Sequence, residues 1–104
     1  MTDGGEPQDE SRGALRRPVA LEARLRDRTS TRVGIHVLDL STTGFRAEAD
    51  YSLDPGNIVW IALPGLAGLE ARVAWRKGRL IGAAFVQPLH PAVFDHIVTL
   101  AGKD

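Results

Sequence analysis

The chain has 104 residues, with 13 basic side chains, 13 acidic side chains and no cysteine. This length provides one small hydrophobic core, which excludes a two-domain enzyme. The lack of cysteine excludes a disulfide framework, a thiolate metal site and a thiol nucleophile. No stretch approaches the roughly 20 apolar residues of a membrane span, so we expect a cytoplasmic protein without membrane insertion.

The charges are unevenly distributed along the chain. Residues 1–10 contain four acids and no base, whereas residues 11–32 contain seven arginines and two acids. We predict that residues 1–11, rich in glycine and acids, form a disordered acidic tail, and that residues 12–102 form a single folded domain. With zero net charge overall, the arginines indicate a local anion site rather than a nucleic-acid surface.

Alternating apolar and polar residues in the first half of the chain predict strands with one buried face. The pattern covers residues 19–25 and 31–40, with a polar turn near Asp27–Ser30 between them. A cluster of turn formers, Asp39–Gly44, precedes a third predicted strand at residues 45–49.

The second half continues with short strands and clear turn signals. Asp54-Pro55-Gly56-Asn57 predicts a type II turn, because proline presets φ and glycine accepts a positive φ. An apolar strand follows at residues 58–63, and Pro64-Gly65 and Gly68 are expected to break the chain before the next strand. The later strands are predicted at residues 69–76, with Leu69, Ala71, Val73 and Trp75 on one face, and at residues 80–86 after a hairpin at Lys77-Gly78.

Six short strands with hairpin-length connections predict a mainly β fold, a six-stranded antiparallel barrel, because closure removes unpaired strand edges. The last segment is different, since apolar residues 93–101 recur at helical spacing. Pro91 suits the first helical position and Gly102 suits the helix end. We predict one C-terminal helix that packs on the mouth of the barrel.

The sequence does not support a catalytic site or a metal site. His36 and Asp39 lie three positions apart on a strand, so their side chains point to opposite faces and cannot converge with Ser41. His90 and His96 are six residues apart, which does not suit a metal site on a helix, and we expect solvated or capping roles. We therefore expect no enzyme, no metal and no cofactor.

Two polar groupings remain. Arg12 and Arg16 form an RxxxR pattern with Arg17 directly after, and guanidinium groups pair bidentately with phosphates and purine edges. Asp39-x-Ser41-x-x-Gly44 follows the second strand, where a carboxylate can accept from the N1–H and N2–H of guanine. Gly44 would let the backbone turn with a positive φ or approach a ligand closely. Taken singly, the two groupings also fit a solvated basic linker and an ordinary serine turn.

Together the two motifs resemble the PilZ domain family. The order of the motifs is that of the family: RxxxR comes before the first strand and DxSxxG after the second. A later strand with Val73-x-Trp75 leads into Ile81-Gly82-x-x-Phe85. The resemblance covers roughly residues 10–100. The resemblance implies a six-stranded barrel with a C-terminal helix. It also implies binding of the bacterial second messenger cyclic di-GMP, often as a stacked dimer.

The resemblance implies roles for individual residues. Arg12 and Arg16 would contact the phosphates and guanine edges, while Asp39 and Ser41 would hold the other guanine above Gly44. Two further contacts stay open: Arg17 as an additional ligand residue, and Trp75 as either an aromatic face for the ligand or a packing residue of the core or rim.

We therefore expect a single-domain, non-enzymatic cyclic di-GMP receptor or adaptor, monomeric, whose N-terminal arginine loop closes over the ligand. Because one small domain has no output module, an unidentified protein partner would carry the signal. The alternative is a PilZ-fold interaction module that does not bind the nucleotide. A single-strand nucleic-acid binder is less well supported, since the aromatic residues form no run on one strand face.

Overall fold

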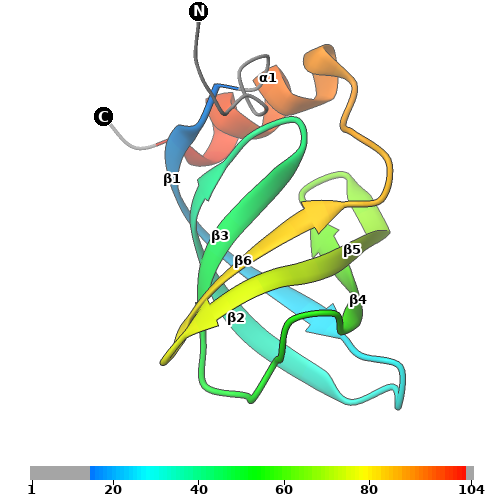
Figure 1. Ribbon diagram of the computed structural model, residues 1–104. Helices are drawn as coiled ribbons and strands as arrows, with labels where there is room; N and C mark the ends of the chain where they lie inside the picture. The colour runs from blue at the N-terminus through cyan, green and yellow to red at the C-terminus, as the bar shows by residue number, and fades with distance from the viewer. Residues whose placement is uncertain (1–14, 103–104) are drawn as a thin grey trace, which may run out of the picture.

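The computed structural model describes residues 15–102, and these residues form a closed six-stranded barrel with a helix over one end (Figure 1). All neighbouring strands are antiparallel, in the order β1-β2-β3-β6-β5-β4. The elements are β1 (Arg17–Arg26), β2 (Arg32–Leu40), β3 (Gly44–Ala49), β4 (Ile58–Leu63), β5 (Leu66–Lys77), β6 (Leu80–Phe85) and α1 (Pro91–Ala101). The predicted fold class is confirmed, whereas the predicted acidic tail lies outside the described residues.

Two glycines with positive φ shape one connection between strands and one irregularity within a strand. Gly56 has a φ of +94° and the N–H of Asn57 donates to the Asp54 carbonyl at 3.0 Å, which confirms the predicted turn. The expectation that Gly68 breaks the chain is wrong, because β5 already begins at Leu66. Gly68 instead lies within β5 at a φ of +72°, beside a shift in the β4–β5 register, so it forms a bulge that only glycine adopts without strain.

The predicted alternation in β5 also fails at its end. A register shift in the β5–β6 pairing lies between Val73 and Trp75. The Trp75 side chain therefore does not point into the barrel as those of Ala71 and Val73 do. Trp75 pairs with Gly82 and remains 37% exposed. One irregular residue therefore moves the indole from the predicted apolar face to the outer surface.

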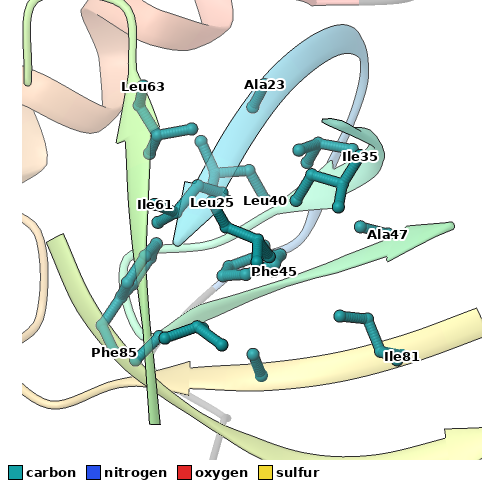
Figure 2. Close-up of a cluster of buried hydrophobic side chains, with 14 of the residues drawn as sticks. Ala23, Leu25, Ile35, Leu40, Phe45, Ala47, Ile61, Leu63, Ile81 and Phe85 are labelled. Atoms are coloured by element: carbon teal, nitrogen blue, oxygen red, sulfur yellow. The ribbon is translucent and has the colours of Figure 1, made fainter. Parts of the chain in front are cut away.

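The barrel interior is filled by the inward side chains of the strands (Figure 2). The rings of Phe45 in β3 and Phe85 in β6 lie with centroids 5.7 Å apart at 44°, a tilted arrangement favoured by aromatic pairs. Leu25, Ile61 and Ile81 belong to the same cluster and are almost completely buried. Each such side chain contributes roughly 1.5–3 kcal/mol by leaving water, which makes this interior the main source of stability.

Helix α1 covers the barrel end near the β2–β3 turn (Figure 1). Its start is capped by His90, whose Nδ1 accepts from the Ala92 N–H at 3.0 Å, and Pro91 occupies the first turn as predicted. Phe94 and Ile97 are buried against the barrel core. No helix in residues 15–102 is long and apolar enough to cross a membrane.

The turn between β1 and β2 is organised by the carboxylate of Asp27. It accepts from the Thr29 hydroxyl at 2.7 Å, from the N–H groups of Thr29 and Thr31, and from the Tyr51 hydroxyl. The Thr29 hydroxyl hydrogen bond is the main reason that the pKa of Asp27 lies below its ordinary value. The charged form is therefore favoured in the folded state.

This turn predicts an acid-dependent loss of stability. Because the folded pKa is depressed, the contribution of Asp27 is present above the ordinary carboxyl range near about pH 4 and is lost as the pH falls through the folded value. The melting temperature difference between the parent and Asp27→Asn should shrink from pH 7 to pH 3. Thr29→Val, which removes the main stabilising donor, should reduce that pH dependence, and a difference that is constant with pH would contradict this account.

Candidate functional site

One row of paired residues crosses the outside of the barrel over five strands. Asp39 of β2 pairs with Pro18 of β1 and with Arg46 of β3, and Arg46 pairs in turn with Gly82 of β6. Gly82 then pairs with Trp75 of β5. Directly opposite residues in antiparallel strands point to the same side, so these positions form a continuous surface line, called here the outer row (Pro18, Asp39, Arg46, Gly82 and Trp75).

Strand irregularities border this row. The β2–β3 register shifts between Val37 and Asp39, and the β5–β6 register shifts between Val73 and Trp75. Bulges of this kind re-aim side chains and are common beside binding sites. They place Asp39 and Trp75 on the outer surface although the simple alternation of each strand does not predict it.

The carboxylate of Asp39 is held between two arginines. Its Oδ1 accepts from Arg16 Nη1 at 2.8 Å and its Oδ2 accepts from Arg46 Nε at 2.8 Å. The Asp39 side chain is only 12% exposed, whereas those of Arg16 and Arg46 are 53% and 42% exposed. The carboxylate is therefore fixed and largely shielded, while each guanidinium keeps donors that face solvent.

Ser41 has a different role in this structure. Its Oγ accepts from the N–H groups of Thr43 and Gly44, each at 3.2 Å, and its own N–H donates to the Gly44 carbonyl at 2.9 Å. The side chain is buried and closes the turn from β2 to β3. Ser41 thus shapes the corner formed by residues 41–44, and no hydrogen bond among the described residues joins it to Asp39.

Gly44 is required by close packing of two backbones. A Cβ at this position would collide with the Ala83 carbonyl oxygen and would crowd the Ala84 Cα at 3.2 Å. Gly44 does not have a positive φ, so the first of the two expected roles is wrong, while a close approach to a ligand stays a prediction. The close approach that the structure shows is to the backbone of β6. The corner is consequently seated directly against β6.

Gly44→Ala should destabilise the protein by about 1–3 kcal/mol, because backbone atoms cannot give way as a flexible side chain would. For a domain of this size, we expect the melting temperature in thermal unfolding to fall by several degrees. Gly34→Ala is the matched control, since a Cβ there would meet nothing within 4 Å. Equal melting temperatures for the two variants would contradict the packing role of Gly44.

Trp75 covers Gly82. A Cβ on Gly82 would collide with the Trp75 indole, so the ring lies directly over the glycine backbone at a position where any other residue would displace it. Because Gly82 also pairs with Arg46, Trp75 and Arg46 flank the same backbone position from the two neighbouring strands. The outer row therefore presents an aromatic face beside the Asp39–Arg46 pair.

The structure brings some of the predicted site residues together and not others. Arg16 contacts Asp39, which joins the N-terminal arm to the end of β2. Arg17 pairs with Leu40, and strand alternation places its side chain on the opposite side of the chain from that of Arg16. Arg12, the first arginine of the RxxxR pattern, lies outside the described residues.

Arg46 is the site residue that the sequence reasoning missed. A signal for it exists, because the short turn pairs Leu40 with Phe45 and so brings Arg46 opposite Asp39. Two arginines around one carboxylate leave a local excess of positive charge beside an exposed indole. This arrangement can hold a planar, anionic molecule that also offers hydrogen-bond donors to a carboxylate.

Comparison with known proteins agrees with the fold and the motifs. A search of curated proteins finds no match to the chain. The family model for the PilZ domain, in contrast, matches residues 10–102, which includes every strand and the helix. PilZ domains are a known family of cyclic di-GMP receptor domains, and they are typically binding domains rather than enzymes. The chain belongs to the PilZ domain family.

Proposed function

We propose that this protein is a cyclic di-GMP receptor that acts as a non-enzymatic adaptor. The ligand residues are Arg12, Arg16 and Arg17 from the N-terminal arm and Asp39, Ser41 and Gly44 from the corner after β2, with Trp75 at the side. The observation that carries the proposal is the Asp39 carboxylate, held at the surface of the outer row between Arg16 and Arg46.

Guanine recognition is assigned to Asp39. An ionised carboxylate has about four acceptor sites, and the two arginines each occupy one. The N1–H and N2–H groups of a guanine are adjacent donors that match such a carboxylate. Arg46, anchored on β3, keeps the carboxylate oriented, while Arg16 is the partner that the ligand displaces. Ser41 and Gly44 contribute by holding the corner in shape beneath the base.

Phosphate binding is assigned to the arginine arm. Cyclic di-GMP has two phosphate charges, and guanidinium groups bind phosphate oxygens bidentately. Arg16 would exchange its contact with Asp39 for the phosphate, together with Arg12, so that the arm closes over the ligand. Arg17 adds positive charge from the other side of the strand. Binding would thus change the surface that a protein partner meets, which makes the nucleotide a conformational signal.

Arg16→Ala should weaken cyclic di-GMP binding by about one to two decades, because a charged hydrogen bond contributes about 1.5–3 kcal/mol. Asp39→Ala should have an effect of similar size, and Arg17→Ala a smaller one. Isothermal titration calorimetry measures all three. Arg28→Ala, an exposed arginine in the distant β1–β2 turn, is the control and should bind as the parent does.

The same titration separates this proposal from the alternative, an interaction module that keeps the fold without the nucleotide. If titration of the parent protein with cyclic di-GMP gives no heat of binding, the alternative is supported. Parent-like affinity in both Arg16→Ala and Asp39→Ala would leave nucleotide binding intact but would contradict the assigned site.

Trp75 provides an optical test of the site. In a Trp60→Phe background, Trp75 is the sole remaining tryptophan, and a stacked base should quench its fluorescence. Because base stacking contributes about 1–3 kcal/mol, Trp75→Ala should weaken binding by roughly tenfold. Unchanged fluorescence together with unchanged affinity would place Trp75 outside the site.

A further inference from the structure

A second charged surface lies where β1 meets β2 and β4. Arg26 of β1 pairs with Arg32 of β2 on one side and with Trp60 of β4 on the other. Arg24 lies two positions earlier on the same side of β1. These four residues, called here the arginine face (Arg24, Arg26, Arg32 and Trp60), have no part in the proposed nucleotide site.

The arginines of this face lack acidic partners within the described part of the chain. The ion pairs found in residues 15–102 involve Arg16, Arg46, Arg76, Arg79 and His36, and none involves the arginine face. Arg26 and Arg32 are directly opposite on neighbouring strands, an arrangement that destabilises a sheet when the charges are alike. A bound anion would relieve this repulsion.

Arg26 is prearranged for anion binding by Trp60. Its guanidinium carbon lies 4.5 Å from the centroid of the Trp60 ring, in a cation–π contact. A guanidinium stacked on an aromatic ring keeps the N–H donors at its edge available for bidentate pairing with a carboxylate or phosphate. Stacking also limits the rotation of the side chain, which lowers the entropy lost on binding.

The surface beneath these side chains is hollowed. A depression of about 300 Å³ is lined by the arginine face together with Leu25, Ala62 and Gly68. Its lining combines the three arginines with apolar residues. A single carboxylate or phosphate leaves the apolar part of this lining unused, whereas an acidic peptide also covers it with its backbone and with the aliphatic stems of its glutamates.

Acidic residues limit the extent of the positive charge. Glu22 lies two positions before Arg24 on the same side of β1, and Glu70 of β5 pairs with Trp60. A nucleic-acid strand needs a continuous basic track, which these acids interrupt. Arg24 and Arg26 are separated by two strand residues, about 7 Å, which equals the spacing of alternate side chains in an extended peptide.

We propose that the arginine face binds a short acidic segment of a partner protein, whose alternate carboxylates pair with Arg24, Arg26 and Arg32. Along β1, Arg26 lies eight residues after Pro18 of the outer row, a separation of about 26 Å. The two surfaces can therefore be occupied together. The proposal does not depend on nucleotide binding.

The test uses the full chain and a fluorescein-labelled peptide of six Glu-Ser repeats, followed by fluorescence anisotropy at low salt. The parent should bind this peptide and not the corresponding Lys-Ser or Gln-Ser peptide. The triple variant Arg24→Gln, Arg26→Gln, Arg32→Gln should lose at least tenfold in affinity. Arg26→Lys keeps the charge but not the planar stack on Trp60, and should lose about threefold.

A matched control removes the same charge elsewhere: Arg72→Gln, Arg76→Gln, Arg79→Gln on β5 and its hairpin should change peptide affinity by less than twofold. Equal losses in the two triple variants, or no binding by the parent, would overturn the proposal. So would tighter binding of a twelve-residue oligothymidylate than of the peptide. Binding that emerges only after neutralising Asp3, Glu6, Asp9 and Glu10 would assign the face to the chain's own acidic segment instead.

Cyclic di-GMP titration of the same variants keeps the two proposals distinguishable. The arginine-face variant should bind the nucleotide as the parent does, and Arg16→Ala should bind the peptide as the parent does. A parent protein that binds only one of the two ligands would support one proposal and overturn the other.

Discussion

Closure of the barrel rests on three residue pairs between β1 and β4, which join Arg24–Arg26 to Trp60–Ala62. Without this seam, both strands would present unpaired edges to solvent. Closure also divides the side chains of each strand between a packed interior and an outer surface. The outer row and the arginine face are both consequences of that division, since each consists of outward residues brought into register by neighbouring strands.

The candidate nucleotide site is a surface line rather than an enclosed cavity. Its fixed part is Asp39, which is largely buried and held by Arg46 from the adjacent strand. The part that we propose the ligand displaces is Arg16, which belongs to the arm and is about half exposed. A rigid acceptor next to a displaceable cation suits recognition of a ligand with both guanine edges and phosphates. The PilZ family assignment and this geometry therefore point to the same chemistry.

Much of the barrel could be predicted because a closed sheet requires alternation of inward and outward residues, and that pattern is visible in the sequence. Prediction failed at Gly68 and Trp75, where single-residue bulges change the register without changing the composition. The DxSxxG motif indicated the right corner, but the close approach of Gly44 depends on Ala83, far away in the sequence. The position of Arg46 opposite Asp39 could have been predicted from the register of the β2–β3 hairpin, once the length of the turn was known.

The corner at residues 41–44 is tied to the rest of the molecule by two backbone hydrogen bonds. The Phe85 N–H donates to the Thr43 carbonyl at 2.8 Å, and the Leu89 N–H donates to the Thr42 carbonyl at 2.7 Å. Leu89 directly precedes His90, the residue that caps α1. A displacement of the corner would therefore act, through one hydrogen bond and one peptide bond, on the residue that caps α1, so the corner beside Asp39 and the start of the helix are linked by a short covalent and hydrogen-bonded path.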